Sequence, residues 1–199
     1  NYPLFHTPSM LLSNTLQHLP ALLLPFLFSS EEAGIYGLTH RILLIPVSLI
    51  AMSTRGVYLQ KISNCLIENK TIKTLFFKTT LGLFAIGIIP FTIIGLYGED
   101  IFMFVFGKKW ELSGFIAQIA AIYFFILFIK TTTDANIIAL KLQKYNLYFQ
   151  IINLVLGVGI FFLFKSEGFI SVITMFLIIN TLIGMFSMLF FYLKAKKLT

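Results

Sequence analysis

Two oppositely charged residues, Lys130 and Asp134, lie four positions apart in an otherwise apolar stretch of the chain. At this spacing they share one face of a helix, so they can pair and partly neutralise each other. Their order, cation before anion, is the less favourable one for helix stability. Two interpretations follow: a structural ion pair between packed helices, or a carboxylate that takes up a coupling proton during transport.

A polar stripe marks a second apolar segment, in which Arg41, Ser48 and Arg55 are seven residues apart. Arg41 lies about two helical turns inside that segment, where an unpaired charge is costly. Because a guanidinium group binds phosphate oxygens in bidentate fashion, Arg41 and its stripe predict an anion-binding site. Arg55 is nearer to a lysine-rich connector and is expected to extend to the membrane surface as an anchor.

The first apolar segment carries Asn14, Gln17 and His18 at helical spacing. These residues share one face, which should avoid lipid. They can form hydrogen bonds between helices or line a polar cavity, and the sequence leaves both interpretations open. Pro20 and Pro25 follow in the same segment and predict that this helix is interrupted.

Six apolar segments, each about long enough to cross a bilayer, must position these residues. They are residues 9–28, 35–58, 75–97, 115–138, 147–164 and 169–193. With 58% hydrophobic and only 12% charged residues, the chain leaves no room for a soluble domain. The runs lack the alternation of barrel strands, so the sequence predicts an all-α, polytopic membrane protein. The connector 98–114 is expected to lie along the membrane surface, with Trp110 at headgroup level.

The net charge of +7 follows membrane topology and does not indicate a nucleic-acid partner, since the lysines cluster in alternate connectors. The clusters are Lys61, Lys70, Lys73 and Lys78, then Lys141 and Lys144, then Lys194, Lys196 and Lys197. By the positive-inside rule, both ends of the chain are expected to be cytoplasmic. The lone Cys65 falls in a connector expected on that side and cannot form an intrachain disulfide.

Several motifs, taken in order, resemble the second half of a known transporter family. They are Tyr2-Pro3 to Pro8-Ser9, Gln17-His18-Leu19-Pro20, Glu32-Ala33-Gly34-Ile35-Tyr36, His40-Arg41-Ile42-Leu43, Pro46-Val47-Ser48-Leu49-Ile50, Phe106-Gly107-Lys108-Lys109-Trp110 and the basic turn that ends at Lys144. In this order the chain resembles polysaccharide flippases of the Wzx type, within the multidrug, oligosaccharidyl-lipid and polysaccharide exporter superfamily. His40 stands where the family motif usually has Tyr.

The resemblance implies one six-helix lobe of a two-lobed transporter that resembles MATE proteins. Its partner would be a missing N-terminal lobe or a second copy of the chain. The family moves undecaprenyl-pyrophosphate-linked oligosaccharide across the bacterial inner membrane, by alternating access, for surface polysaccharides such as lipopolysaccharide O-antigen. Arg41 would then attract the phosphates, and Asn14, Gln17 and His18 would bind sugar hydroxyls. A protein of this kind is not an enzyme, needs no cofactor or metal, and contacts membrane lipids.

Two other functions are weighed against this one. A drug or cation antiporter of the same superfamily would need an acidic cavity, whereas this sequence places more cations than acids at membrane depth. A membrane-embedded glycan polymerase or glycosyltransferase would need a large hydrophilic loop or an acidic metal-binding motif. The sequence has neither.

Overall fold

The computed structural model describes the backbone of residues 2–68 and 72–198, and the side chains of residues 7–65, 67–68 and 72–194. Lys70 and the side chains of Lys196 and Lys197 lie outside these residues. The described chain is helical, with no strand, and six stretches are long and apolar enough to cross a membrane. The protein is therefore an all-α, polytopic membrane protein, as the sequence predicts.

The helices, in chain order, are α1 (Tyr2–Leu27), α2 (Ser30–Ile67), α3 (Ile72–Phe106), η1 (Lys108–Trp110), α4 (Glu111–Ile129), α5 (Thr131–Ala139), α6 (Gln143–Leu163), η2 (Lys165–Glu167) and α7 (Phe169–Leu198). Several extend beyond the predicted spans. At 1.5 Å per residue, α2 is about 57 Å long, well beyond the roughly 30 Å hydrocarbon core. The length of the apolar run therefore underestimates the length of the helix. Cys65 lies in the last turns of α2 and not in a connector.

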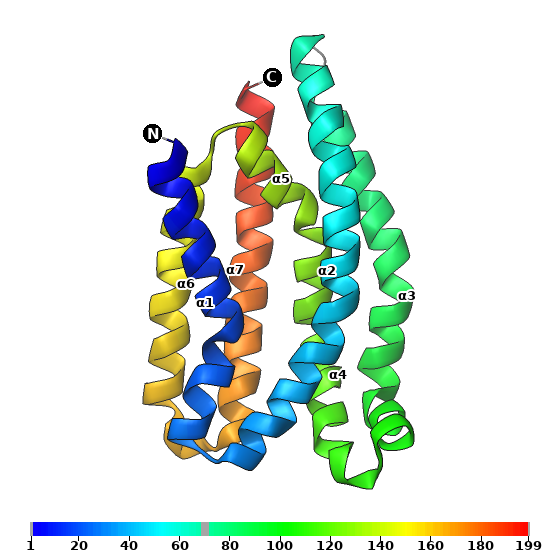
Figure 1. Cartoon of the computed structure of the whole chain (residues 1–199), viewed down its shortest axis with the longest axis vertical. Helices are drawn as coiled ribbons and strands as arrows, with labels where there is room; N and C mark the ends of the chain where they lie inside the picture. The colour runs from blue at the N-terminus through cyan, green and yellow to red at the C-terminus, as the bar shows by residue number, and fades with distance from the viewer. Residues whose placement is uncertain (1, 69–71, 199) are drawn as a thin grey trace.

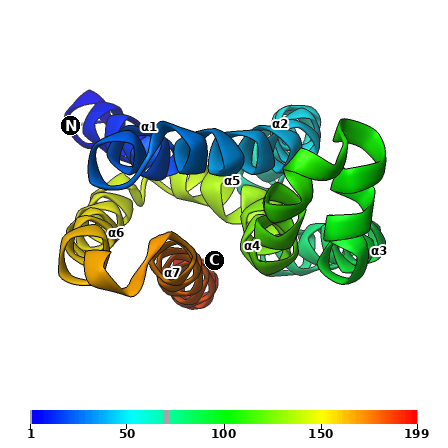
Figure 2. The same cartoon turned by 90° about the horizontal axis from the view of Figure 1, so that it is seen from below.

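The start of α1, the end of α2, the start of α3 and the end of α7 lie at the same end of the molecule (Figure 1). This end also carries most of the lysines and is called the lysine-rich end below; its described lysines are Lys61, Lys73, Lys78, Lys141, Lys144 and Lys194. Helices α1 and α2 pack together at the opposite end and diverge towards the lysine-rich end (Figure 1). Seen along the long axis, α1 and α2 form one row, with α6, α7, α4 and α3 beside it (Figure 2).

The predicted interruption of α1 is wrong. Pro8, Pro20 and Pro25 all lie inside one continuous helix. Each proline removes a single backbone donor, and the remaining backbone hydrogen bonds keep the helix continuous. The break is instead in the fourth predicted span, where α4 ends and α5 begins on either side of Lys130.

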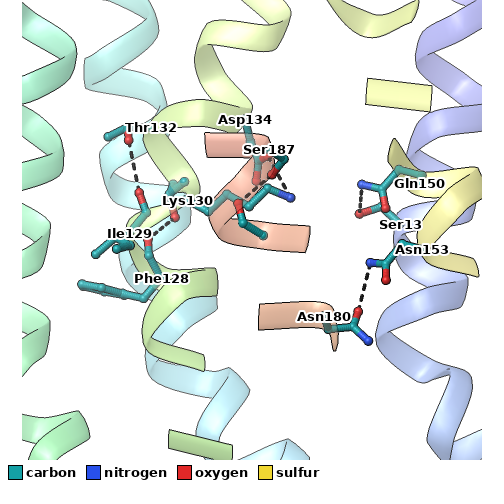
Figure 3. A network of polar contacts seen from close by, with 12 residues as sticks. Ser13, Phe128, Ile129, Lys130, Thr132, Asp134, Gln150, Asn153, Asn180 and Ser187 are labelled. Carbon is teal, nitrogen blue, oxygen red and sulfur yellow. Dashed lines mark hydrogen bonds and ion pairs between the residues drawn. The ribbon is translucent and has the colours of Figure 1, made fainter. Parts of the chain in front are cut away.

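Hydroxyl groups account for the bend at Lys130. Thr131 donates a hydrogen bond to the carbonyl of Phe128 at 2.7 Å, and Thr132 donates to that of Ile129 at 3.1 Å (Figure 3). Such bonds to the preceding turn compete with the backbone ladder and bend helices. As a result α5 turns away from the axis of α4 and crosses towards α6 (Figure 1).

A second bend shapes α3, in which Tyr97 has the non-helical angles φ −124° and ψ 18°. The segment after it is helical and turns across the end of the molecule (Figures 1 and 2). Next to the bend, α3 and α4 touch through glycines: a Cβ on Gly114 would lie 2.5 Å from the carbonyl oxygen of Gly98. Small residues allow such close backbone approach in membrane helix pairs.

Helix α4 is the most buried span. Half of its most apolar 18-residue window is buried, against about a fifth for the corresponding windows of α1, α2, α3 and α6. Its side chains Ile116, Ala120 and Phe124 belong to the main apolar cluster, which α1, α2, α3, α6 and α7 complete. The other spans therefore surround α4 and leave broad surfaces exposed.

Candidate functional site

A polar groove opens where α1 and α2 diverge, and α5 forms its floor. We call it the α1–α2 groove and define it by Asn14 and Gln17 of α1, Ser48 and Arg55 of α2, and Thr131 and Asp134 of α5. It consists of two adjoining hollows of about 180 and 280 Å³ that share Arg55 and Asp134. The bend at Lys130 creates the floor, since it carries Asp134 from the axis of α4 into the gap between α1 and α2.

Apolar side chains line the deeper hollow beside these polar groups. They are Leu44, Val47, Ala51 and Met52 of α2 and Leu127 of α4. The groove thus offers a guanidinium, a carboxylate, amides and hydroxyls against an apolar wall. This combination suits a ligand with both polar and apolar parts.

A pair of histidines lies where α1 and α2 come together. The rings of His18 and His40 are 5.8 Å apart, and His40 also lies against Tyr36 and Phe124 at 5.8 and 5.6 Å. His40, the departure from the family motif, is therefore a packing residue between α1, α2 and α4. His18 lies at this contact between α1 and α2 and does not line the groove.

Lys130 and Asp134 form the ion pair that their spacing suggests, with 3.9 Å between the ammonium and a carboxylate oxygen (Figure 3). The two side chains have different environments. Asp134 is 52% exposed and faces the groove, whereas Lys130 is only 17% exposed. Lys130 approaches Asp134 from the interior of the protein. Its ammonium attracts the carboxylate electrostatically but does not form part of the groove wall.

A smaller hollow, separate from the two hollows of the groove, lies between α1, α4, α6 and α7, and Lys130 lines it. We call it the inner cavity. Its polar lining consists of Ser13, Gln17, Tyr123, Lys130, Gln150, Asn153, Asn180 and Ser187. Gln150 donates to Ser13 at 3.4 Å, and Asn153 donates to Asn180 at 3.0 Å (Figure 3). The Oδ1 atom of Asn153 is buried and has no hydrogen-bond partner among the described residues. Such an acceptor is a place for ordered water.

The structure thus brings together four of the predicted site residues in one groove: Asn14, Gln17, Ser48 and Asp134. Arg41 is exposed on α2 and is not among the residues that line the two hollows, while Arg55 lines both. The anchor role predicted for Arg55 is therefore incomplete, because its side chain also faces Asp134 across the groove. Formally, Arg55 and Lys130 outnumber Asp134 by one positive charge.

The polar face of α6 is a part of the site that the sequence predictions do not include. Gln143, Asn146, Gln150 and Asn153 follow one another at intervals of three and four residues, and all four line the groove or the inner cavity. This period is a recognisable signal of one helix face. On α7, Asn180 and Ser187 are seven residues apart and also face the inner cavity.

Exposed polar residues are distributed unevenly around the molecule. On α6 and α7, each described exposed side chain between 151 and 164 and between 170 and 193 is apolar. The exposed face of α3 between 79 and 96 carries no charge. By contrast, the exposed positions of α1 and α2 within their spans include Asn14, Thr15, His18, Arg41, Ser48, Ser53 and Arg55.

No family model, curated protein or solved structure matches this chain. Its function must therefore be argued from the groove and its surroundings. Among the described residues, no group of three or more His, Cys, Asp or Glu side chains is arranged to hold a metal ion. The groove can bind a ligand: the Arg55 guanidinium can bind an anion, and the amides and hydroxyls can form hydrogen bonds with a polar ligand.

Proposed function

We propose that this chain is one lobe of a flippase that moves an undecaprenyl-pyrophosphate-linked oligosaccharide across the bacterial inner membrane. One observation carries the proposal: Asn14, Ser48 and Arg55, polar side chains that a lipid-facing surface would avoid, are exposed on α1 and α2 and line the groove. An arginine exposed to lipid costs about 2.5–3.5 kcal/mol on insertion scales. The α1–α2 face is therefore expected to border water or protein, while the apolar faces of α3, α6 and α7 border lipid.

The size of the groove supports a two-lobed transporter. Hollows of about 180 and 280 Å³ can hold a small polar group but not an oligosaccharide. A second lobe facing α1 and α2 would enclose a larger cavity, with the groove as part of its wall. That lobe is the N-terminal half of the same polypeptide or a second copy of this chain.

Charge supports an anionic, lipid-linked substrate. Arg55 and Arg41 would attract a pyrophosphate, and Asn14, Gln17 and Ser48 would form hydrogen bonds with sugar hydroxyls. The polyprenyl tail would stay in lipid beside the lobe. Helices α1 and α2 diverge towards the lysine-rich end (Figure 1), which the positive-inside rule assigns to the cytoplasm, so this conformation would receive substrate from the inner leaflet.

The test measures surface glycan and inner-leaflet lipid-linked oligosaccharide in cells that carry the full-length protein. Arg55→Ala and Arg41→Ala should each lower surface glycan about ten-fold or more, because a charge-assisted hydrogen bond contributes about 1.5–3 kcal/mol. Lipid-linked oligosaccharide should accumulate on the inner leaflet. The lysine substitutions at these positions should retain part of the activity. Lys165→Ala, which removes an exposed cation from the opposite end of the molecule, is the matched control.

Two outcomes would contradict the proposal. Normal surface glycan in both alanine variants, at normal protein level, would show that these cations do not serve transport. Single repeat units at the cell surface would instead indicate a polymerase, because such an enzyme acts after translocation.

Asp134 favours one alternative, a cation antiporter of the same superfamily, because its half-exposed carboxylate faces the groove. In that case Asp134→Asn should abolish resistance to cationic drugs and leave surface glycan unchanged.

A further inference from the structure

The far side of α2 carries another groove, which faces α3 and is separate from the α1–α2 groove. Ser53, Thr54, Val57, Tyr58 and Lys61 of α2 line it together with Thr79 of α3, around a hollow of about 300 Å³. We call it the α2–α3 groove. Its only charged lining residue is Lys61, which is exposed.

Tyr58 forms the floor of this groove and is held in place from behind. Its side chain is buried, and its hydroxyl donates to Oδ1 of Asn136 on α5 at 3.3 Å. Tyr58 also packs in a small apolar cluster with Ile62, Ile72 and Phe76, which joins α2 to α3 above the groove. The groove is therefore a fixed feature of the α2–α3 pair.

Counting along both helices places the α2–α3 groove at the edge of the hydrocarbon core. About 20 helical residues cross the core. On α2, 20 residues counted from Ile35, which follows the acidic first turn, end at Thr54. On α3, 20 residues counted back from Gly98, which precedes an acidic pair, end at Thr79. Thr54 and Thr79 thus lie at the same depth, where lipid headgroups begin.

The chemistry of the lining fits a phospholipid headgroup. An ammonium and several hydroxyls lie at headgroup depth, and Val57, 55% exposed, adds an apolar surface. On the core side of Thr79, Ile86 lies two turns away on the same face of α3 and is 60% exposed, which suits an acyl chain. Basic pockets between membrane helices bind anionic lipid headgroups in this way.

We propose that the α2–α3 groove binds an anionic phospholipid, with its phosphate at Lys61 and its acyl chains along α3. The lipid is favoured over a free phosphate because the groove opens at headgroup depth beside an apolar helix face. The bound lipid would bridge α2 and α3 at the point where their direct packing ends. This inference does not depend on the proposed transport activity.

Native mass spectrometry of the delipidated full-length protein in mild detergent, titrated with phosphatidylglycerol or phosphatidylcholine, tests the proposal. Phosphatidylglycerol should bind at least about five-fold more tightly than phosphatidylcholine. Lys61→Gln should remove this preference, because one lysine near an anionic headgroup corresponds to about a five-fold change in the dissociation constant. Lys61→Arg, which keeps the charge, should retain it. Lys144→Gln, which removes another exposed lysine from the same end of the molecule, should bind as the wild type does.

Three results would overturn the proposal. Equal affinity of the wild type for the two lipids would exclude an anion-selective site. An unchanged preference in Lys61→Gln would place any lipid site elsewhere. If inorganic phosphate binds in a Lys61-dependent manner and phosphatidylglycerol binds no more tightly, the groove takes a free anion and not a lipid.

Discussion

Removing the carboxylate of the Lys130–Asp134 ion pair should lower the stability of the protein more than removing the ammonium. Lys130 is 17% exposed and reaches into the inner cavity, whereas Asp134 is 52% exposed and faces Arg55 across the groove. In Asp134→Asn, a mostly buried ammonium loses the one ion-pair partner that it has among the described residues. In Lys130→Met, the remaining carboxylate keeps access to water and to Arg55. The two single variants are therefore not equivalent.

The magnitudes follow from these environments. An unpaired charge at the centre of a membrane helix costs about 2.5–3.5 kcal/mol on insertion scales. Lys130 lies nearer to the edge of the core than to its centre but is only 17% exposed, so we expect Asp134→Asn to lower the free energy of unfolding by about 2 kcal/mol. Half of Asp134 is solvated, and we expect about 1 kcal/mol for Lys130→Met. The double variant buries no lone charge and should lie within about 1 kcal/mol of the wild type.

Equilibrium unfolding of the purified protein in mixed micelles would measure all three variants, and the double-mutant cycle isolates the coupling between the two residues. Lys165→Met and Glu167→Gln, at exposed positions of η2, make the same charge changes in water and should each shift stability by less than about 0.5 kcal/mol. The reasoning is refuted if Lys130→Met is the more damaging single variant, or if the double variant loses the sum of both.

Two further predictions concern helix packing and topology. Gly114→Ala should destabilise the protein by about 1–3 kcal/mol in the same unfolding assay, since its Cβ would meet the Gly98 carbonyl oxygen at 2.5 Å; Gly82→Ala, with nothing within 4 Å, should have little effect. Cysteines placed at Ser30 and Lys141 should react with a membrane-impermeant thiol reagent from the outer and cytoplasmic sides of the membrane respectively. The reverse pattern would invert the orientation inferred from the lysines.

The sequence is sufficient for the fold class, because six apolar runs of bilayer length permit little else. It does not give the helix ends. An apolar run stops at the first charged residues, whereas the backbone hydrogen bonds of α2 and α3 continue past Lys61 and Lys73. Nor does it locate the bend. Proline is the more obvious signal, yet α1 continues through Pro20, and the two threonines after Lys130 bend the fourth span instead.

The candidate site was accessible to sequence analysis only in part. Helical spacing identifies polar faces such as Asn14 with Gln17, or Lys130 with Asp134. It cannot say which faces meet, since that depends on how α1, α2 and α5 are arranged in space. Arg55 is an example. Its position near the lysine-rich connector predicts a surface anchor, but the bend in the fourth span brings Asp134 into the groove that Arg55 lines.

The contact between α1 and α2 at His18 and His40 has a consequence for the proposed transporter. His18 and His40 lie together where α1 and α2 meet, and the helices separate only towards the lysine-rich end. If a second lobe covers the α1–α2 face in the proposed transporter, alternating access would require α1 and α2 to separate at the end where they now meet. That separation would break the contact between His18 and His40, so we expect this contact to differ between the two states of the proposed transporter.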